Sequence, residues 1–162
     1  MDFISHYDSP LGGITLASDG TNLVGLWFDG QKGFADTLDK THVNCGDLPI
    51  FEQTRRWLDC YFANEVPDFT PPLKMRGSIF RRRVWEILLT IPYGQSTTYG
   101  KIAQKLDILS AQAVGGAVSH NPISLIIPCH RVVGANGSLT GYAGGVERKK
   151  QLLQMEYLKS EL

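Results

Sequence analysis

Residues 97–120, TTYGKIAQKLDILSAQAVGGAVSH, contain two short helical segments separated by a tight connection. The pair Thr97-Thr98 can cap a first helix over residues 99–106, and Ser110 can cap a second over residues 111–120. A hydroxyl at such a position accepts a hydrogen bond from an amide of the first turn, which has no partner within the helix. Two short helices joined by a tight turn are typical of a helix-turn-helix.

The same half of the chain carries three further segments. Ser78 can cap a helix that ends near Pro92. Residues 124–133 form an apolar stretch that we expect to be extended, and residues 146–158 have the pattern of a closing helix. Together with the helix-turn-helix, these segments predict a helical, winged-helix-like domain over residues 74–162.

The first half of the chain has the pattern of a small antiparallel sheet covered by a helix. Turn pairs such as Asp19-Gly20 separate short apolar segments, and glycine accepts the positive φ of tight turns at little cost. An aromatic and aliphatic stripe then recurs at helical spacing over residues 51–63. We therefore predict an α+β chain whose N-terminal α/β support domain covers residues 1–73. The expected strands are residues 3–7, 13–18 and 23–28, and the segment 31–49 is expected to be partly loop.

Charge is unevenly distributed between the two halves, although the 16 basic and 16 acidic residues cancel over the whole chain. Residues 1–77 contain six Lys and Arg against eleven Asp and Glu, whereas residues 78–162 contain ten against five. A basic second half favours contact with phosphate. Chance can also produce a difference of this size at these counts.

Composition excludes some classes of protein. No run of 18 apolar residues indicates a membrane span, and the first residues lack the basic and apolar regions of a signal peptide. The three cysteines, Cys45, Cys60 and Cys129, contain no Cys-x-x-Cys pair. This pattern fits a reduced cytosolic protein better than a disulfide-rich or zinc-binding one. We therefore expect a cytoplasmic protein with no bound metal and no membrane partner.

Residues 111–117, AQAVGGA, place Gly115 and Gly116 inside the second helix. Each glycine costs a helix about 1 kcal/mol relative to alanine, so the pair favours a close approach of another element to the helix backbone. That element is either another helix or a nucleic acid, because a face of small side chains suits the narrow minor groove. The residues expected to contact DNA are Ala111, Gln112, Gly115 and Gly116.

A second candidate feature is the run Ile127-Pro128-Cys129-His130-Arg131. A thiol reacts as its thiolate, and an imidazole nearby can take the proton. Adjacent residues of a strand point to opposite faces, so this proton transfer could require a water between Cys129 and His130. Taken alone, the Cys-His pair fits a structural role as well as a catalytic one.

Residues 126–133, IIPCHRVV, resemble the acceptor-site motif of the O6-alkylguanine-DNA alkyltransferases. The resemblance is dense over residues 78–158 and looser over the first half of the chain. Further motifs flank the acceptor site in the order in which the family has them. They are Val84-Trp85, Ile91-Pro92-Tyr93-Gly94, residues 98–103 (TYGKIA), residues 113–117 (AVGGA), Asn121-Pro122, residues 141–145 (GYAGG) and Leu152-Leu153.

The resemblance implies direct repair of DNA, in which the alkyl group of O6-alkylguanine moves irreversibly to Cys129, with O4-alkylthymine as a further substrate. Such a protein places the second helix of its helix-turn-helix in the minor groove and flips the damaged nucleotide into a pocket, because the reacting atom is out of reach inside a stacked duplex. In this scheme His130 is the base that acts through a water, Glu156 orients and polarises His130, and Asn121 braces the active-site turn.

The resemblance also assigns contacts to the flipped guanine. Tyr99 assists flipping and donates a proton toward N3, and the main chain of Cys129 and Val132 accepts from the exocyclic amine. The Ala143 amide donates to O6, and Tyr142 shapes the pocket. The family needs no cofactor, its partner is double-stranded DNA, and a monomer is expected.

Gln112 departs from the family pattern, in which an arginine at this position fills the gap left by the flipped base. This substitution puts the efficiency of flipping in question. Three other readings compete: a lesion-binding protein that transfers nothing, an unrelated cysteine-dependent hydrolase or transferase, and a transcriptional regulator. Cys129 in the acceptor motif, together with the flanking motifs, favours alkyl transfer over all three.

Overall fold

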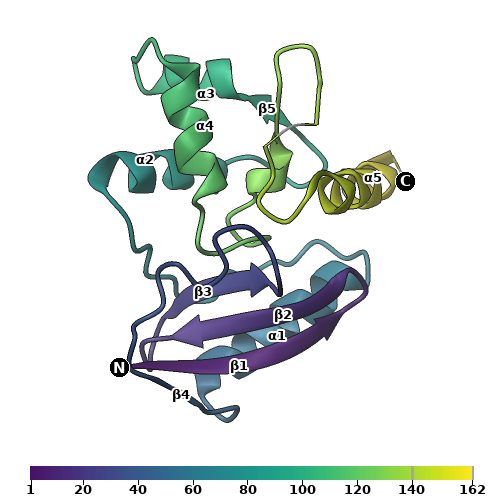
Figure 1. The fold of residues 1–162 in the computed structure, drawn as a ribbon. Helices are drawn as coiled ribbons and strands as arrows, with labels where there is room; N and C mark the ends of the chain where they lie inside the picture. Colours follow the sequence, from purple (N-terminus) through teal and green to yellow (C-terminus); the bar gives the residue numbers. More distant parts are fainter. Residues whose placement is uncertain (140, 162) are drawn as a thin grey trace. The chain divides into compact units, whose positions relative to one another are not determined.

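The computed structural model describes residues 1–139 and 141–161, with side chains as far as residue 158. The chain forms two compact units, Met1–Arg76 with Pro122–Ser124 and Gly77–Asn121 with Leu125–Leu162 (Figure 1). The mixed α+β class predicted from the sequence is confirmed. The domain extents 1–73 and 74–162 stay a prediction. Within the described residues, no helix combines the length and the apolar character that a membrane span requires.

The first unit contains a four-stranded sheet with the order β3-β2-β1-β4. Strands β1 (Asp2–Ser9), β2 (Gly12–Ser18) and β3 (Leu23–Phe28) form an antiparallel meander that contains the three predicted strands. The short strand β4 (His42–Asn44) pairs in parallel with β1 and lies in the segment expected to be partly loop. All three of its residues are exposed, so no alternation of buried and exposed positions marks it in the sequence.

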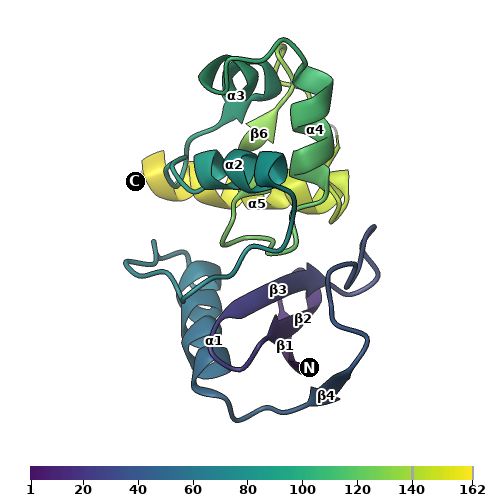
Figure 2. The same ribbon diagram turned by 90° about the vertical axis from the view of Figure 1, so that its left-hand side faces the viewer.

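Helix α1 (Pro49–Phe62) packs against the three long strands of this sheet (Figure 2). Its buried residues recur at the three- and four-residue spacing of one helix face. The helix begins two residues earlier than predicted, because proline at its first position already has the required φ. Trp57 and Tyr61 stack with their ring centroids 5.2 Å apart.

Residues Pro122–Ser124 add a short parallel pairing to β3. The Leu26 amide donates to the Pro122 carbonyl and the Ser124 amide donates to the Leu26 carbonyl, each at 2.9 Å. Ile123 is fully buried. This pairing fixes the backbone a few residues upstream of Cys129.

The second unit is mainly helical. Its elements are α2 (Ile79–Leu88), β5 (Thr97–Thr98), α3 (Tyr99–Lys105), α4 (Ala111–Ser119), the 3-10 helix η1 (Cys129–Arg131), β6 (Val132–Val133) and α5 (Val146–Glu161). The hydroxyls of Ser78, Thr98 and Ser110 cap α2, α3 and α4, as predicted. The Trp85 indole of α2 donates to the Ala117 carbonyl of α4 at 2.8 Å.

The expectation of an extended stretch over residues 124–133 is wrong. Leu125 has a φ of 70°, in the left-handed region, and Cys129–Arg131 form one turn of 3-10 helix. Only Val132–Val133 is extended, where β6 pairs in parallel with β5. A continuous apolar sequence does not distinguish a buried strand from a buried turn, and this segment is a buried turn.

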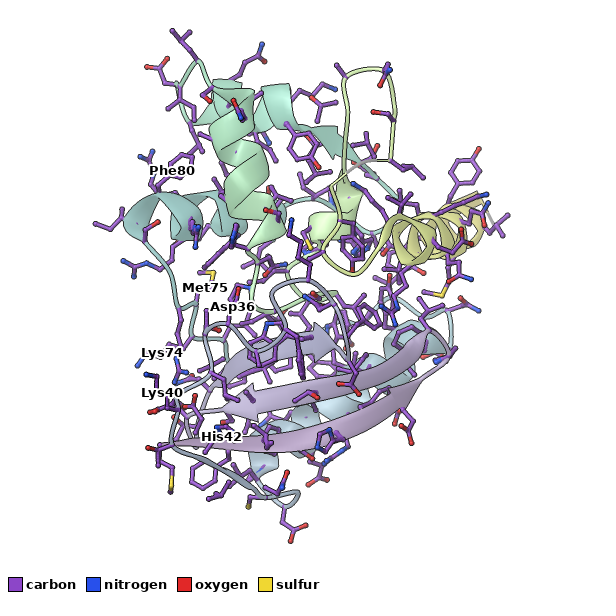
Figure 3. All side chains as sticks on the ribbon, in the orientation of Figure 1. Asp36, Lys40, His42, Lys74, Met75 and Phe80 are labelled. Atoms are coloured by element: carbon purple, nitrogen blue, oxygen red, sulfur yellow. The ribbon has the colours of Figure 1, made fainter. Side chains whose placement is uncertain are left out.

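The end of the first unit is held by an ion pair between Asp2 and Arg76. The guanidinium donates to both carboxylate oxygens, at 2.6 and 2.8 Å, and also to the Thr37 carbonyl at 3.1 Å. The Asp2 carboxylate is almost completely buried and also accepts from the Asp39 amide. The segment around Lys74 and Met75, which leads to this arginine, is labelled in Figure 3.

Asp2→Asn should lower the free energy of unfolding by about 2–3 kcal/mol, because it leaves the partly buried guanidinium without its anion. The Arg76 hydrogen bond holds the pKa of Asp2 below its ordinary value, so this stabilisation is present above the unfolded pKa and disappears as the pH falls. Urea unfolding at pH 7 and pH 3 measures it. Asp8→Asn, an exposed position on the same strand, is the control and should change little. Equal stability of the Asp2 and Asp8 variants at pH 7 would contradict this account.

Candidate active site

Cys129 lies at the start of a tight, buried turn. Its side chain is buried, and its amide donates to the Ile127 carbonyl at 2.8 Å. The Asn121 side chain donates to the same carbonyl, also at 2.8 Å. The Arg131 amide closes the turn on the Pro128 carbonyl at 3.0 Å. Asn121, two residues after α4, therefore braces the backbone that carries the thiol.

The carboxylate of Glu156, on α5, joins the segments around this turn. One oxygen lies 2.5 Å from His130 Nε2. The other accepts from Arg131 Nε at 2.7 Å and from the Gly94 amide at 3.3 Å. Glu156 and His130 are both almost completely buried. A charge withdrawn from water is stable only with such partners, which makes Glu156 part of the site and not a surface residue near the chain end.

Arg131 was not among the residues that sequence analysis selected. Its guanidinium donates to the Ile91 carbonyl at 2.7 Å and lies 5.7 Å from the centre of the Tyr93 ring. With its bond to Glu156, it connects the turn, α5 and the loop after α2. The usable signal in the sequence was its position directly after Cys129-His130. Residue type alone did not indicate burial, because arginine is almost never fully buried unless it is paired.

The His130–Glu156 pair is a neutral imidazole facing a carboxylate. Burial alone would raise the pKa of Glu156, but the hydrogen bonds from His130 and Arg131 hold it well below its ordinary value. Burial lowers the pKa of His130 and outweighs the attraction of the carboxylate. A neutral histidine that donates through Nε2 has its basic lone pair on Nδ1. His130 is thus prepared to accept a proton, and Glu156 is placed to stabilise the imidazolium that results.

Burial raises the pKa of the Cys129 thiol to about 11, while a hydrogen bond from the Asn121 side chain and the positive charge of Lys149 act in the opposite direction. Lys149 is itself buried, seven residues before Glu156 on the same face of α5. Sequence analysis missed it, although this two-turn spacing from Glu156 was a usable signal. With its pKa raised in this way, the thiol is largely protonated at neutral pH, so any reaction as a thiolate requires a group that accepts its proton.

Tyr99, the first residue of α3, lies between α4 and the loop that carries Tyr142. A Cβ atom on Gly115 would lie 3.8 Å from the Tyr99 ring, and one on Gly141 would lie 3.3 Å from its hydroxyl. Burial and the nearby Cys129 both raise the pKa of Tyr99. The structure thus brings Tyr99 close to α4 and to the 141–145 loop.

The other residues predicted around the guanine lie in the same unit. Tyr142 is buried and Ala143 half-buried in the 141–145 loop, and Val132 is buried on β6, directly after the turn. A cavity of about 470 Å³ is lined by Glu156, but neither Cys129 nor Tyr99 lines it. That cavity therefore does not give access to the Cys129 thiol.

Helix α4 has one buried and one open face. Val114, Ala117 and Val118 are buried, whereas Ala111, Gln112 and Gly116 are exposed. A Cβ atom added at Gly116 would meet no described atom within 4 Å. Packing within the described part of the chain therefore does not require this glycine, which favours the approach of an external molecule over the approach of another helix.

Comparison with known families covers both halves of the chain. Residues 3–75 match the ribonuclease-like domain of 6-O-methylguanine DNA methyltransferase, and residues 79–158 match its DNA-binding domain. The chain belongs to this methyltransferase family. The resemblance seen in the sequence is thereby confirmed.

Curated members of the family carry the name methylated-DNA–protein-cysteine methyltransferase, the activity expected from the sequence. The chain is 44% identical to the Mycobacterium tuberculosis protein over 156 residues, which cover 93% of this chain and 92% of that one. It is 40% identical to the Haemophilus influenzae protein over 156 residues, with 95% and 86% covered.

Solved structures of family members have the same fold. The O6-methylguanine methyltransferase of M. tuberculosis matches with a TM-score of 0.86 at 42% identity, covering 98% of this chain and 94% of that one. M. tuberculosis OGT in complex with DNA matches with a TM-score of 0.87, also at 42% identity, with 97% and 94% covered. The likeness extends over both units, so the family assignment does not depend on the acceptor motif alone.

Glu156→Gln should lower the free energy of unfolding at pH 7 by about 3 kcal/mol, since Arg131 loses the buried anion that balances it. The depressed pKa of Glu156 means that this stabilisation is complete above the unfolded value of about 4.3 and is lost as the pH falls. The gap between wild type and variant should therefore close in acid. Denaturant unfolding from pH 7 to pH 3 measures it.

Glu147→Gln, in the exposed first turn of the same helix, is the matched control and should leave the unfolding curve nearly unchanged. A Glu156→Gln variant whose deficit is the same at pH 7 and pH 3 would show that this carboxylate is not charged in the folded protein.

Proposed function

We propose that the protein repairs O6-alkylguanine in double-stranded DNA by moving the alkyl group to Cys129 in one irreversible turnover. The observation that carries the proposal is the buried Cys129 thiol beside His130 in the sequence, with His130 Nε2 in contact with the carboxylate of a buried Glu156. In a chain of this family, the arrangement has the parts of an activated nucleophile: a thiol, a base and a group that orients the base.

The reaction begins with removal of the thiol proton. His130 takes this proton through one water, and Glu156 stabilises the imidazolium. The Cys129 sulfur then attacks the alkyl carbon, a carbon–sulfur bond forms, and the bond from that carbon to guanine O6 breaks. The electron pair of the broken bond stays with the guanine, to which Tyr99 donates a proton at N3. The high pKa of the buried thiol supports removal of the proton during the reaction and not before it.

The products explain the single turnover. Cys129 becomes a thioether, whose carbon–sulfur bond lacks the acyl carbon at which water attacks a thioester. The restored guanine returns to the stack. Asn121 holds the turn during the attack, the main chain of Cys129 and Val132 accepts from the guanine amine, and the Ala143 amide donates to O6 beside Tyr142.

The open face of α4 is the proposed contact with the minor groove. Ala111 and the two glycines permit close approach, and Gln112 occupies the place of the family's arginine. Arg82 and Arg83 of α2 are exposed, and such side chains can neutralise phosphates and make binding salt-dependent. Flipping the nucleotide brings O6 to the thiol. O4-alkylthymine, with an alkylated oxygen on a smaller base, is a further substrate.

One molecule acts on one lesion, because each chain supplies a single acceptor and a single α4. We infer that it acts in the cytoplasm as a monomer. The three cysteines, all within the described residues, form no disulfide. Unpaired thiols favour a reducing compartment.

Incubation with duplex DNA that contains O6-methylguanine should add the mass of one methylene unit to each protein molecule, on the peptide that contains Cys129. Intact-protein and peptide mass spectrometry measure this. Cys129→Ser should abolish transfer while duplex binding persists, and Cys60→Ser should behave as wild type. Repeated turnover with excess DNA, or a label on Cys45 or Cys60, would refute the proposed function.

Gly116→Ala should separate stability from function. The substitution should raise the free energy of unfolding by up to about 1 kcal/mol, because alanine favours the helix and its methyl group meets open space. It should weaken duplex affinity by roughly tenfold, equivalent to about 1.4 kcal/mol, because the same methyl group holds the helix away from the groove.

Gly100→Ala is the control for this effect. Gly100 is an exposed glycine in α3, where an added Cβ makes only an ordinary contact. It should not lower the affinity, as measured by fluorescence anisotropy with a labelled duplex. Unchanged binding by Gly116→Ala would remove this part of α4 from the proposed interface.

A further inference from the structure

Leu109 lies in the turn of the helix-turn-helix and is fully exposed, at 106% of the reference value for leucine. It packs against nothing in the described part of the chain, so it adds no core stability. A single exposed leucine is common on protein surfaces. What makes this one informative is the backbone that holds it and the surface on which it lies.

The turn that carries Leu109 is fixed on both sides. At the end of α3, Asp107 has a φ of 55° and donates its amide to the Gln104 carbonyl at 3.1 Å, while the Ile108 amide donates to the Ala103 carbonyl at 3.0 Å. These two bonds are the Schellman motif that ends many helices. On the other side, the Ser110 hydroxyl accepts from the Ala113 amide at 3.0 Å. The backbone of Leu109 is therefore held while its side chain points into solvent.

The surface around Leu109 has no charge of its own. All five residues of 109–113 are exposed, and none is ionisable, although Lys105 and Asp107 lie just upstream. Leu109 is the only bulky apolar side chain among them, and it directly precedes the open face of α4. The next long side chain is Gln112, which is uncharged.

We propose that Leu109 is an apolar wedge that inserts from the minor groove into a base-pair step of duplex DNA beside the damaged nucleotide. This inference rests on the proposed function, because α4 must face the groove for Leu109 to reach the bases. Apolar side chains on minor-groove proteins unstack such steps and bend the duplex. Because the turn is already fixed, less conformational entropy is lost on insertion. Burial of the leucine side chain between the bases then offsets part of the free-energy cost of unstacking them.

Gln112 is uncharged and shorter than the arginine it replaces, so it holds the bases apart only weakly. Leu109 would perform this function from the turn. The wedge is a positioning residue: it touches the DNA next to the lesion but not the alkyl group. It should therefore affect events on duplex DNA and have no effect on a substrate that needs no unstacking.

The test compares Leu109→Ala, Leu109→Met and Leu109→Lys with wild type. Each protein receives a duplex with O6-methylguanine next to the fluorescent base 2-aminopurine, whose emission rises when it is unstacked. In parallel, each receives the free base O6-benzylguanine. Leu158→Ala, the same change at an exposed leucine of α5, is the matched control. Thermal unfolding should be the same for all variants, because Leu109 has no packing to lose.

We expect Leu109→Ala to lose the rise in fluorescence and to repair the duplex about tenfold more slowly, because the three carbon atoms that the substitution removes are only partly buried between the bases. Its reaction with the free base should equal that of wild type. Leu109→Met should retain the signal. Leu109→Lys should lack the fluorescence rise, even if its positive charge increases the affinity for DNA. Leu158→Ala should match wild type throughout.

Three outcomes would overturn the wedge while leaving the proposed function intact. The first is an unchanged fluorescence rise in Leu109→Ala. The second is a full rise in Leu109→Lys, which would indicate a phosphate contact. The third is equal slowing on the duplex and on the free base. Failure of the wild-type protein to transfer any methyl group to Cys129 would instead refute the proposed function.

Discussion

The carboxylate of Glu156 is the interaction on which the rest of the site depends. Buried on α5, it holds His130 with one oxygen and Arg131 and the Gly94 amide with the other. A carboxylate without partners in that place would cost several kcal/mol. The three contacts keep it ionised, and the ionised form in turn fixes the orientation of the His130 imidazole. The same few atoms therefore stabilise the fold and orient the proposed base.

Much of the architecture was readable from local sequence. The hydroxyls of Ser78, Thr98 and Ser110 marked the starts of three helices, because capping depends only on a side chain and the amides of the next turn. The meander was predictable for a similar reason, since Asp-Gly pairs determine turns with little help from distant residues. Helix starts and turns could be predicted because they depend on residues that are close together in the sequence.

The features that could not be predicted from the sequence depend on contacts between residues far apart in the chain. The turn at Leu125 and Cys129–Arg131 has the apolar composition of a strand, and only its surroundings make it a turn. Arg131 and Lys149 are charged residues that reasoning from composition places at the surface, yet both are buried around the thiol. Their roles follow from α5 meeting the turn, a contact between segments far apart in the chain. The roles of Tyr99 and Glu156 came from family resemblance, and nothing in their local sequence indicated them.

The pairing of Pro122–Ser124 with β3 has a consequence for modularity. These three residues lie between α4 and Cys129, yet they take their hydrogen-bond partners from Leu26 in the N-terminal sheet. A gene segment that encodes only the helical half would produce a polypeptide whose loop before the thiol has lost those partners. The helical half alone would therefore keep its own helices but lose the two backbone hydrogen bonds that hold this loop.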